Sequence, residues 1–528
     1  MNIHHKKTAL LLSAIIASPV GQAELKGPWM PAYEAVKARP ISRAAPQAVE
    51  KNKCYSNTKA LRCSQLVQSL TKDTILKARL LASLSVSSLL LPDGTALGDE
   101  YNYGEATQDV NIYRITYKSI KTSGRGKGKP TILSGLVVIP NQRGIVSAKD
   151  GMVVYMHSTT ADINNASGDR SEEAYGAITA FAGNDWVVAM PDYLGYGPNK
   201  EPHPYALGKL NAESGVSIIA ATRELYKKLR IEPDAIGNQI NVTGYSEGGG
   251  NALWLGRILD ERYNCTGCNN SEMAPTRIAP MSGAYDLSGA TAMSFVETQP
   301  NSSYASENTM DKPTLLAFAA VGTSKVANVQ LDTLLKTELA DQAVGLFPGI
   351  YPDTVVGGRM LTVGIDQLGY IEGFSPVPHP ENLLQPELVQ AIQTKDYTNP
   401  AMSVWLENDN LDWVPKVPVY LLGVIQDTIV PFASKTYPLP NPYVTQLNGQ
   451  PAPYSGGNSE SVMKAMRAQG LSNDQVAWMG FNGLIKDADD KYQSTMTHST
   501  AFVPDTILAA SFFRGGKSLN QLPQLADP

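Results

Sequence analysis

One tight turn constrains the fold of this chain more than any other stretch. Residues 244–248 read Gly-Tyr-Ser-Glu-Gly, a Gly-x-Ser-x-Gly pattern. Residues 239–243, Gln-Ile-Asn-Val-Thr, predict a buried strand before the turn, and apolar side chains at helical spacing over 251–260 predict a helix after it. A serine on such a turn has strained backbone angles, so the residues two positions away must lack bulk, and both are glycine. The pattern therefore predicts a strand, a turn that lifts the Ser246 hydroxyl clear of a sheet, and a helix.

Strand-like and helix-like segments alternate on both sides of this turn. Further strands are predicted over 110–120, 131–140, 152–156, 186–190, 278–281, 417–424 and 475–481, and a helix over 212–229. This alternation favours an α/β fold with a mostly parallel, doubly wound sheet and helices on both faces. A mainly helical cap insertion is predicted where helix-like segments dominate, at 314–320, 328–339 and 386–394.

The same patterns divide the chain into five segments. We expect a signal peptide over 1–23, an N-terminal extension over 24–105, core segments over 106–287 and 415–528, and the cap insertion over 288–414 between them. Apolar residues at helical spacing predict that the extension becomes helical from 64 to 91.

The N-terminus is typical of a secretory signal. Lys6 and Lys7 precede an apolar run over 9–20, and small residues before the cut would allow cleavage after Ala23. An uncleaved anchor is the alternative, but the apolar stretch is short for a membrane span. We therefore expect a secreted or periplasmic protein.

Charge, hydropathy and motif content limit the classes of partner and cofactor that we expect for this protein. The formal net charge of −5 and the pI near 5.8 argue against a nucleic-acid-binding protein. Outside the N-terminus no apolar run is long enough to cross a bilayer, so no integral membrane span is expected after signal cleavage. The sequence contains neither a His-Glu-x-x-His motif nor paired Cys-x-x-Cys motifs, so we expect no metal and no cofactor.

The four cysteines form two close pairs in the sequence. In an exported protein an even count indicates disulfides, and our prediction is local pairing of Cys54 with Cys63 and of Cys265 with Cys268, although three pairings are possible. A redox Cys-x-x-Cys should open a helix after a strand, whereas 265–268 follows a predicted helix. A structural disulfide is therefore the preferred interpretation.

His498 is the predicted base for Ser246. A serine hydroxyl is a weak nucleophile until a base accepts its proton, and histidine suits this role near neutral pH. In doubly wound enzymes with a serine nucleophile the histidine follows the last strand. Of the histidines outside the predicted signal, only His498 has this position, before a helix-like run over 501–513.

Asp427 is the predicted acid. It lies just past the strand at 417–424, and its carboxylate would orient the imidazole and stabilise the imidazolium. Asp409 and Asp412 precede that strand, at its wrong end, and are better explained as loop or capping residues. The acidic cluster at 487–490 lacks a full calcium-binding pattern, so a solvated loop is the better interpretation.

Two backbone N–H groups are expected to stabilise the oxyanion that forms on the substrate. The first is the N–H of Glu247, whose carboxylate is expected as a favourable charge near the helix start. The second should come from the loop after the strand at 152–156. There the Ser158 N–H is our prediction, Thr159 is the next choice, and His157 is interpreted as holding the loop.

A set of motifs spread over about residues 105–515 is shared with a known family. The motifs are Tyr-Met-His-Ser-Thr-Thr at 155–160, Pro-Asp-Tyr-Leu-Gly-Tyr-Gly at 191–197, Gly-Tyr-Ser-Glu-Gly-Gly at 244–249, Asp427 followed by Val-Pro at 430–431, and His498. On these residues the chain resembles the α/β-hydrolases, and in particular secreted lipases and esterases of the secretory lipase type. The resemblance implies hydrolysis of small-molecule or lipid carboxylic esters through an acyl-enzyme, no cofactor, and a helical cap over the acyl site. Ser158 departs from the glycine that is commoner at its position.

Two other functions stay open from the sequence. A serine peptidase of aminopeptidase or prolyl type would use the same triad on the same fold, although no charged anchor for a peptide terminus is identified. The other is a non-catalytic secreted binding protein on a hydrolase scaffold. The intact set of Ser246, Asp427 and His498 counts against it.

Overall fold

A computed structural model gives the fold. It describes residues 51–72, 97–98, 101, 106–141, 144–163, 172–297, 312–344, 346–347, 349, 383–438, 452–481, 485–486, 492–494 and 497–528. The predicted signal peptide at 1–23 and the acidic cluster at 487–490 lie outside these described residues.

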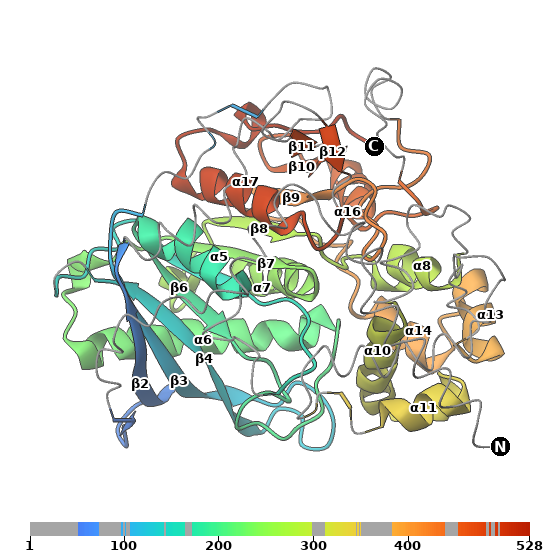
Figure 1. Ribbon diagram of the computed structural model, residues 1–528, viewed down its shortest axis with the longest axis horizontal. Coiled ribbons are helices and arrows are strands. Elements are labelled where there is room, and N and C mark those ends of the chain that lie inside the picture. Colours follow the sequence, from blue (N-terminus) through green and yellow to red (C-terminus); the bar gives the residue numbers. More distant parts are fainter. Residues whose placement is uncertain are drawn as a thin grey trace.

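A ten-stranded mixed sheet forms the centre of the described chain (Figure 1). Its strands are β1 (Lys53–Cys54), β2 (Leu61–Leu70), β3 (Val110–Ile120), β4 (Pro130–Pro140), β5 (Gly151–Met156), β6 (Trp186–Pro191), β7 (Ile240–Tyr245), β8 (Arg277–Met281), β9 (Val419–Val424) and β10 (Val476–Phe481). They lie in the order β1-β2-β3-β4-β6-β5-β7-β8-β9-β10. From β1 to β6 in this order the neighbours are antiparallel, and from β6 to β10 they are parallel. A separate pair, β11 (Ile485–Lys486) and β12 (Tyr492–Ser494), is antiparallel.

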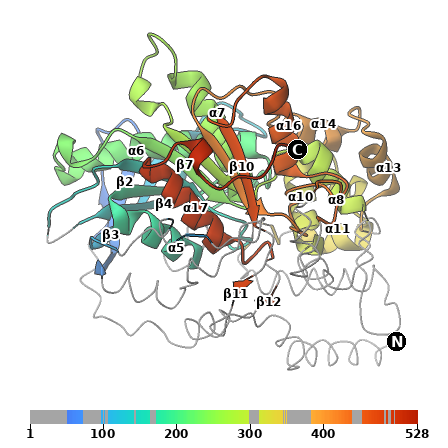
Figure 2. The same cartoon turned by 90° about the horizontal axis from the view of Figure 1, so that it is seen from above.

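Helices cover both faces of the parallel part of the sheet. On one face α6 (Gly208–Leu229) packs beside α7 (Glu247–Tyr263), and on the other α5 (Glu172–Ala180) packs beside α17 (Phe502–Arg514) (Figure 2). α16 (Asn458–Ala468) packs on β10. Strands covered on both faces read as continuous apolar runs, and β5, β6, β7, β9 and β10 are buried along their whole length. The predicted doubly wound arrangement is therefore confirmed.

The helices between β8 and β9 gather at one end of the molecule (Figure 1). They are α8 (Ala292–Val296), α10 (Lys312–Ala327), α11 (Thr337–Ala343), α13 (Pro386–Thr394) and α14 (Pro400–Leu406). These helices share a hydrophobic cluster separate from that of the sheet, with Phe318 and Phe347 stacked inside it. A mainly helical insertion was predicted here, and α13 has the predicted bounds. The predicted helix at 328–339 is wrong in detail, because a short 3₁₀ turn at Leu331–Thr333 precedes α11.

The predicted helix from 64 to 91 is also wrong over its first residues. Leu61–Leu70 forms β2, which pairs antiparallel with β3. Two non-local contacts favour the strand: the disulfide between Cys54 and Cys63 ties β2 to β1, and the Glu224 carboxylate of α6 accepts the N–H groups of residues 59–61 at 2.7–2.9 Å. Residues 73–91 lie outside the described residues.

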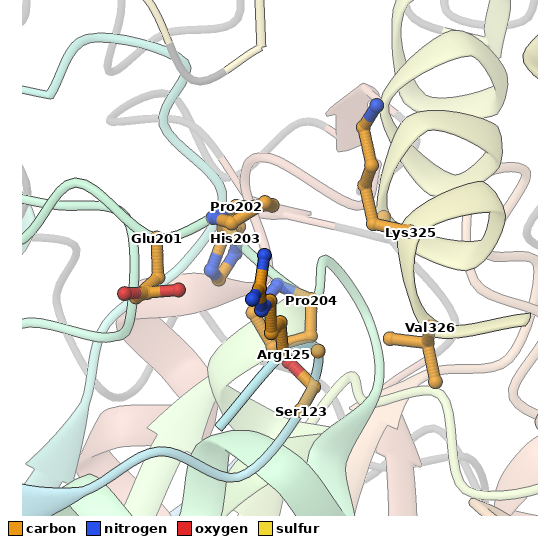
Figure 3. A pocket seen from close by; sticks show the side chains of 10 residues that line it. Ser123, Arg125, Glu201, Pro202, His203, Pro204, Lys325 and Val326 are labelled. Atoms are coloured by element: carbon orange, nitrogen blue, oxygen red, sulfur yellow. The ribbon is translucent and has the colours of Figure 1, made fainter. Parts of the chain in front are cut away.

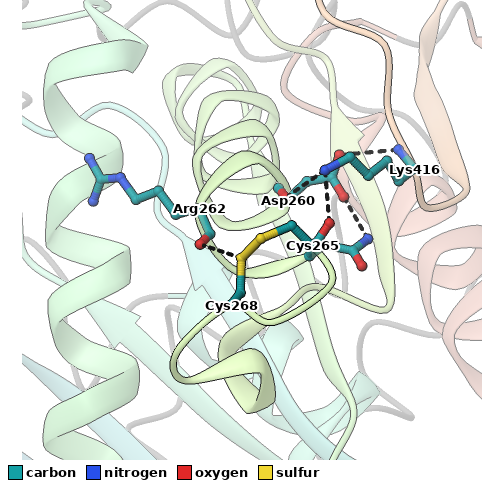
Figure 4. The surroundings of a disulfide bond; sticks show 6 residues. Asp260, Arg262, Cys265, Cys268 and Lys416 are labelled. Carbon is teal, nitrogen blue, oxygen red and sulfur yellow. Dashed lines mark hydrogen bonds between the residues drawn. A yellow bond between two sulfur atoms is a disulfide. The ribbon is translucent and has the colours of Figure 1, made fainter.

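Both disulfides have the predicted local pairing. The Cys265–Cys268 bond closes the loop after α7 (Figure 4). Beside it, the Lys416 ammonium donates to the Asn264 carbonyl at 2.8 Å, and the buried Asp260 carboxylate accepts the Lys416 N–H at 3.1 Å. The bond follows a helix, and the Lys416 contacts tie the neighbouring chain to the segment before β9, so its surroundings are those of a structural disulfide.

No helix in the described part of the chain combines the length and apolarity that crossing a membrane requires.

Candidate active site

Ser246 lies on the turn between β7 and α7, in a backbone conformation that is strained for any residue except glycine. Its φ is 57° and its ψ is −119°. Neighbouring hydrogen bonds hold this conformation: the Ser246 N–H donates to the Met281 carbonyl at the end of β8 at 3.0 Å, and the Gly249 N–H donates to the Ser246 carbonyl at 2.9 Å. The turn therefore projects the hydroxyl beyond the carboxyl ends of the parallel strands.

The glycines of the motif are required by close backbone packing. A Cβ on Gly248 would overlap the carbonyl oxygen of Met156 at the end of β5. A Cβ on Gly244 would approach the same oxygen, and one on Gly249 would overlap the Met281 carbonyl oxygen. The steric argument made from the sequence thus holds, with the end of β5 as the obstructing element.

The predicted nucleophile, base and acid lie in one hydrogen-bonded chain. His498 Nε2 is 2.8 Å from Ser246 Oγ, and His498 Nδ1 is 2.7 Å from Asp427 Oδ2. Asp427 follows β9 and His498 precedes α17, so both reach Ser246 from the carboxyl edge of the sheet. The sequence separations of 252 and 71 residues mean that only the fold brings them together.

The Asp427 carboxylate is fully buried and fixed at both oxygens. Its Oδ1 accepts the N–H groups of Ile429 and Val430, each at 2.8 Å, and its Oδ2 faces the imidazole. The hydroxyl of Tyr245 donates to the His498 carbonyl and holds the histidine backbone from the other side. The imidazole is therefore constrained through its ring and its backbone.

A second buried carboxyl, that of Asp505 on α17, lies close to this pair. Burial raises its pKa well above the usual range, and the Asp427 charge raises it further, while a hydrogen bond from Ser282 Oγ at 3.1 Å and the charge of His498 lower it. Burial therefore favours the protonated form of the Asp505 carboxyl, and it is the Asp427 carboxyl whose oxygen faces the His498 ring. No role was predicted for Asp505 from the sequence, although an acid inside the apolar run at 501–513 was a signal for it.

The structure contradicts the prediction that Ser158 is the second oxyanion donor. The Ser158 N–H donates to Glu173 Oε1 at 2.8 Å, and its hydroxyl donates to Glu173 Oε2 at 2.5 Å. The half-buried Glu173 side chain thus accepts the N–H group that was assigned to the oxyanion. Thr159 is left as the candidate for the second oxyanion donor from this loop. The first predicted donor, Glu247, is the first residue of α7, where backbone N–H groups have no partner within the helix.

Two tyrosines of the motif at 191–197 form hydrogen bonds with the two ends of the 157–160 loop. The Tyr193 hydroxyl donates to the His157 carbonyl at 2.7 Å, and the Tyr196 hydroxyl donates to the Thr160 carbonyl at 2.5 Å. The His157 ring stacks on Tyr193 at 4.1 Å, and its Nδ1 is 2.7 Å from the Ser158 carbonyl oxygen. His157 therefore supports the loop, as the sequence suggested.

The Glu247 carboxylate lies in the first turn of α7. It is buried, and its Oε1 lies 2.8 Å from Nε2 of His203, a residue to which the sequence analysis gave no role. The two residues are 44 positions apart, and no local pattern links them.

The acids set aside in the sequence analysis have other partners. Asp409 accepts the Ser288 N–H at 2.9 Å and its hydroxyl at 2.5 Å, and burial raises the pKa of this carboxyl to about 7. Asp412 pairs with Arg257 on α7. Both belong to the connections of the helical insertion and not to the triad.

A pocket of about 260 Å³ opens between the β3–β4 hairpin loop, the segment at 201–204 and α10 (Figure 3). Arg125 lies on the hairpin side, and Lys325 and Val326 lie on the α10 side. Neither Ser246 nor His498 nor Asp427 is among the residues that line it. Within the described residues no cluster of histidine, cysteine and acidic side chains could hold a metal ion.

The strand order, the helices on both faces and the serine on its strand-to-helix turn give this chain the α/β-hydrolase fold. It is similar to the rice cell wall degrading esterase LipA from Xanthomonas oryzae, with a TM-score of 0.60 and 19% identity over 88% of this chain and 100% of that chain. It is also similar to a putative hydrolase from Legionella pneumophila, with a TM-score of 0.59 and 20% identity over 87% of this chain and 98% of that chain. At these identities the likeness shows the fold. No protein-family model matches the chain, and no curated protein matches its sequence.

Proposed function

We propose that this protein is a serine hydrolase that cleaves carboxylic esters. The observation that carries the proposal is the unbroken chain from Ser246 Oγ through His498 to Asp427, with steps of 2.8 Å and 2.7 Å. An ionised carboxylate only accepts, so it holds the His498 proton on Nδ1 and leaves the lone pair of Nε2 facing the serine hydroxyl. That is the tautomer a general base needs.

In the proposed reaction Ser246 Oγ attacks the ester carbonyl carbon while its proton moves to His498 Nε2. The tetrahedral oxyanion accepts the Glu247 N–H and, in our proposal, the Thr159 N–H, each worth about 3 kcal/mol. Collapse of the intermediate breaks the bond to the alcohol, which leaves with the proton from His498. A water molecule then transfers a proton to His498 and attacks the acyl carbonyl carbon. As the bond between Ser246 Oγ and the acyl group breaks, His498 returns its proton to Oγ and the acid is released.

The setting of the site supports an exported enzyme that acts on esters. The LipA to which the chain is similar is named an esterase, and the two disulfides fit an oxidising compartment. With the proposed signal at 1–23, we place the protein outside the cytoplasm. The helices from α8 to α14 are proposed to cap the acyl side of the site, because they leave and re-enter the core at β8 and β9, next to the triad.

The test compares p-nitrophenyl acyl esters, from acetate to palmitate, with aminoacyl and prolyl p-nitroanilides. Wild-type protein should turn over at least one ester faster than any anilide, and Ser246→Ala should reduce hydrolysis to the background rate. Faster turnover of an anilide would point to a serine peptidase. No turnover of either class would point to a binding protein on this scaffold.

A further inference from the structure

Behind the nucleophile, Glu247 and His203 form a fully buried pair. Both side chains are 0% exposed, and Glu247 Oε1 lies 2.8 Å from His203 Nε2. The other ring nitrogen, Nδ1, lies 3.0 Å from the Leu194 carbonyl oxygen. Glu247 is the residue whose N–H is proposed to bind the oxyanion, so this pair restrains that residue through its side chain.

The hydrogen-bond partners determine how many protons the pair holds. The Leu194 carbonyl can only accept, so His203 Nδ1 carries a proton. A second proton must lie between Nε2 and Oε1, because an unprotonated Nε2 would otherwise face a carboxylate at 2.8 Å with two lone pairs opposed. The pair is therefore an imidazolium with a carboxylate or an imidazole with a carboxylic acid, and in both forms the hydrogen bond is directional and strong.

A stack of rings connects this pair to the loop that carries the other proposed donor. The Tyr193 ring is 5.7 Å from the His203 ring at an interplanar angle of 9°, and 4.1 Å from the His157 ring at 21°. The Tyr193 hydroxyl also donates to the His157 carbonyl at 2.7 Å. His157, Tyr193 and His203 thus bridge the start of the 157–160 loop and the residue after the nucleophile.

We infer that His203 is a positioning residue that sets the place of the Glu247 N–H relative to the 157–160 loop. This inference rests on the proposed serine hydrolase function. His203 is fully buried and acts through Glu247 on one side and through Tyr193 on the other. The ring also lies 5.5 Å from the ring of Phe318 on α10, so the helices between β8 and β9 pack against this support as well.

Three variants separate positioning from mere stability. His203→Phe keeps a ring in the stack but removes both hydrogen bonds, and it leaves the Glu247 carboxylate buried with a weak contact to Asn211 at 3.3 Å, so the protein should lose stability. Glu247→Leu removes the carboxylate. The double variant removes both polar groups and should recover part of the stability lost in His203→Phe.

All three variants should have kcat about 10- to 100-fold below wild type, with KM changed by less than about threefold, because mispositioned oxyanion donors affect the transition state more than substrate binding. Glu247→Gln can donate to a neutral His203 Nε2, so it should lose less kcat than Glu247→Leu. Tyr437→Phe is the matched control: it removes a buried tyrosine hydrogen bond, to the Ala526 carbonyl at 3.0 Å, away from the triad, and should keep the wild-type kcat.

The measurements are kcat and KM on the best p-nitrophenyl ester, together with urea unfolding of each variant. If the double variant regains kcat along with stability, or if His203→Phe keeps the wild-type kcat, the positioning role is wrong while the proposed function stands. If wild-type protein hydrolyses no ester, the proposed function fails first and this inference fails with it.

Discussion

His498 Nδ1 faces Asp427 Oδ2 at 2.7 Å, and the other oxygen of this carboxylate is already occupied by the N–H groups of Ile429 and Val430. An asparagine here would have only one satisfactory orientation. Its oxygen would accept the two backbone N–H groups, and its NH₂ would then donate to His498 Nδ1. The proton of the imidazole would move to Nε2, where it blocks acceptance of the serine proton.

Asp427→Asn should therefore lose activity without losing the fold. We expect kcat to fall by about 10³- to 10⁴-fold with little change in KM. Steady-state kinetics and a thermal unfolding curve check this. A variant with near-wild-type kcat would show that Asp427 does not set the tautomer of His498.

Gly248→Ala should disrupt the turn itself. Its Cβ would overlap the Met156 carbonyl oxygen, which belongs to the backbone of β5 and cannot rotate away. Overpacking of this kind should lower the free energy of unfolding by about 2 kcal/mol or more and abolish hydrolysis. Gly516→Ala is the control, since a Cβ there would meet nothing within 4 Å. Equal urea midpoints for the two variants would contradict the steric argument.

The carboxyl of Asp409 should make the free energy of unfolding of the protein depend on pH. Burial raises its pKa to about 7, with a smaller contribution from the charge of Asp286. Between about pH 4 and 7 the folded protein then holds a proton that the unfolded chain has released, so stability falls as pH rises through this window.

Asp409→Asn removes that titration and should keep the acceptor for the Ser288 N–H. Relative to wild type, the free energy of unfolding of the variant should increase as pH rises, by about 1–2 kcal/mol at pH 7.5. This difference is less than the full linkage value because the carboxyl is partly exposed to water. Urea unfolding from pH 4 to 8 measures the difference. Parallel curves for the two proteins would argue against a raised pKa.

The Cys54–Cys63 bond should stabilise the edge of the sheet and leave catalysis unaffected. It joins residues nine positions apart, and a cross-link of this size contributes roughly 2–3 kcal/mol in the chain-entropy account. The paired Cys54→Ser and Cys63→Ser change should lower the free energy of unfolding by that amount at unchanged kcat. Cys265–Cys268 spans only three positions, so its removal should cost less. The reverse order of the two losses would contradict the loop-length argument.

The core and the positions of Ser246, Asp427 and His498 in the fold were predictable because their signals are local or follow from strand order. Parallel strands covered on both faces are short apolar runs, and a nucleophile turn needs glycines at fixed offsets. Strand order then assigned Asp427 and His498, which lie where the prediction put them. The spacing of apolar residues alone could not show whether Leu61–Leu70 is a helix or a strand. Pairing with β3 and the Cys54–Cys63 disulfide favour the strand, and neither is visible in the local pattern.

The residues that sequence reasoning missed act through distant partners. His203 reaches Glu247 across 44 positions, and Ser282 bonds to Asp505 across 223. Ser158 was assigned by its place in the chain, yet its N–H group turns to Glu173, a partner that no motif shows. Orientation of a backbone N–H depends on packing, which position in the sequence does not specify.

The most direct test of the central claim is covalent labelling with a fluorophosphonate, followed by peptide mass spectrometry. An activated serine should take up one label per chain, on the peptide that contains Ser246, and Ser246→Ala should take up none. His498→Ala should label far more slowly than wild type while remaining folded. Absence of label from wild-type protein, or equal labelling of wild type and Ser246→Ala, would contradict the assignment of Ser246 as the nucleophile.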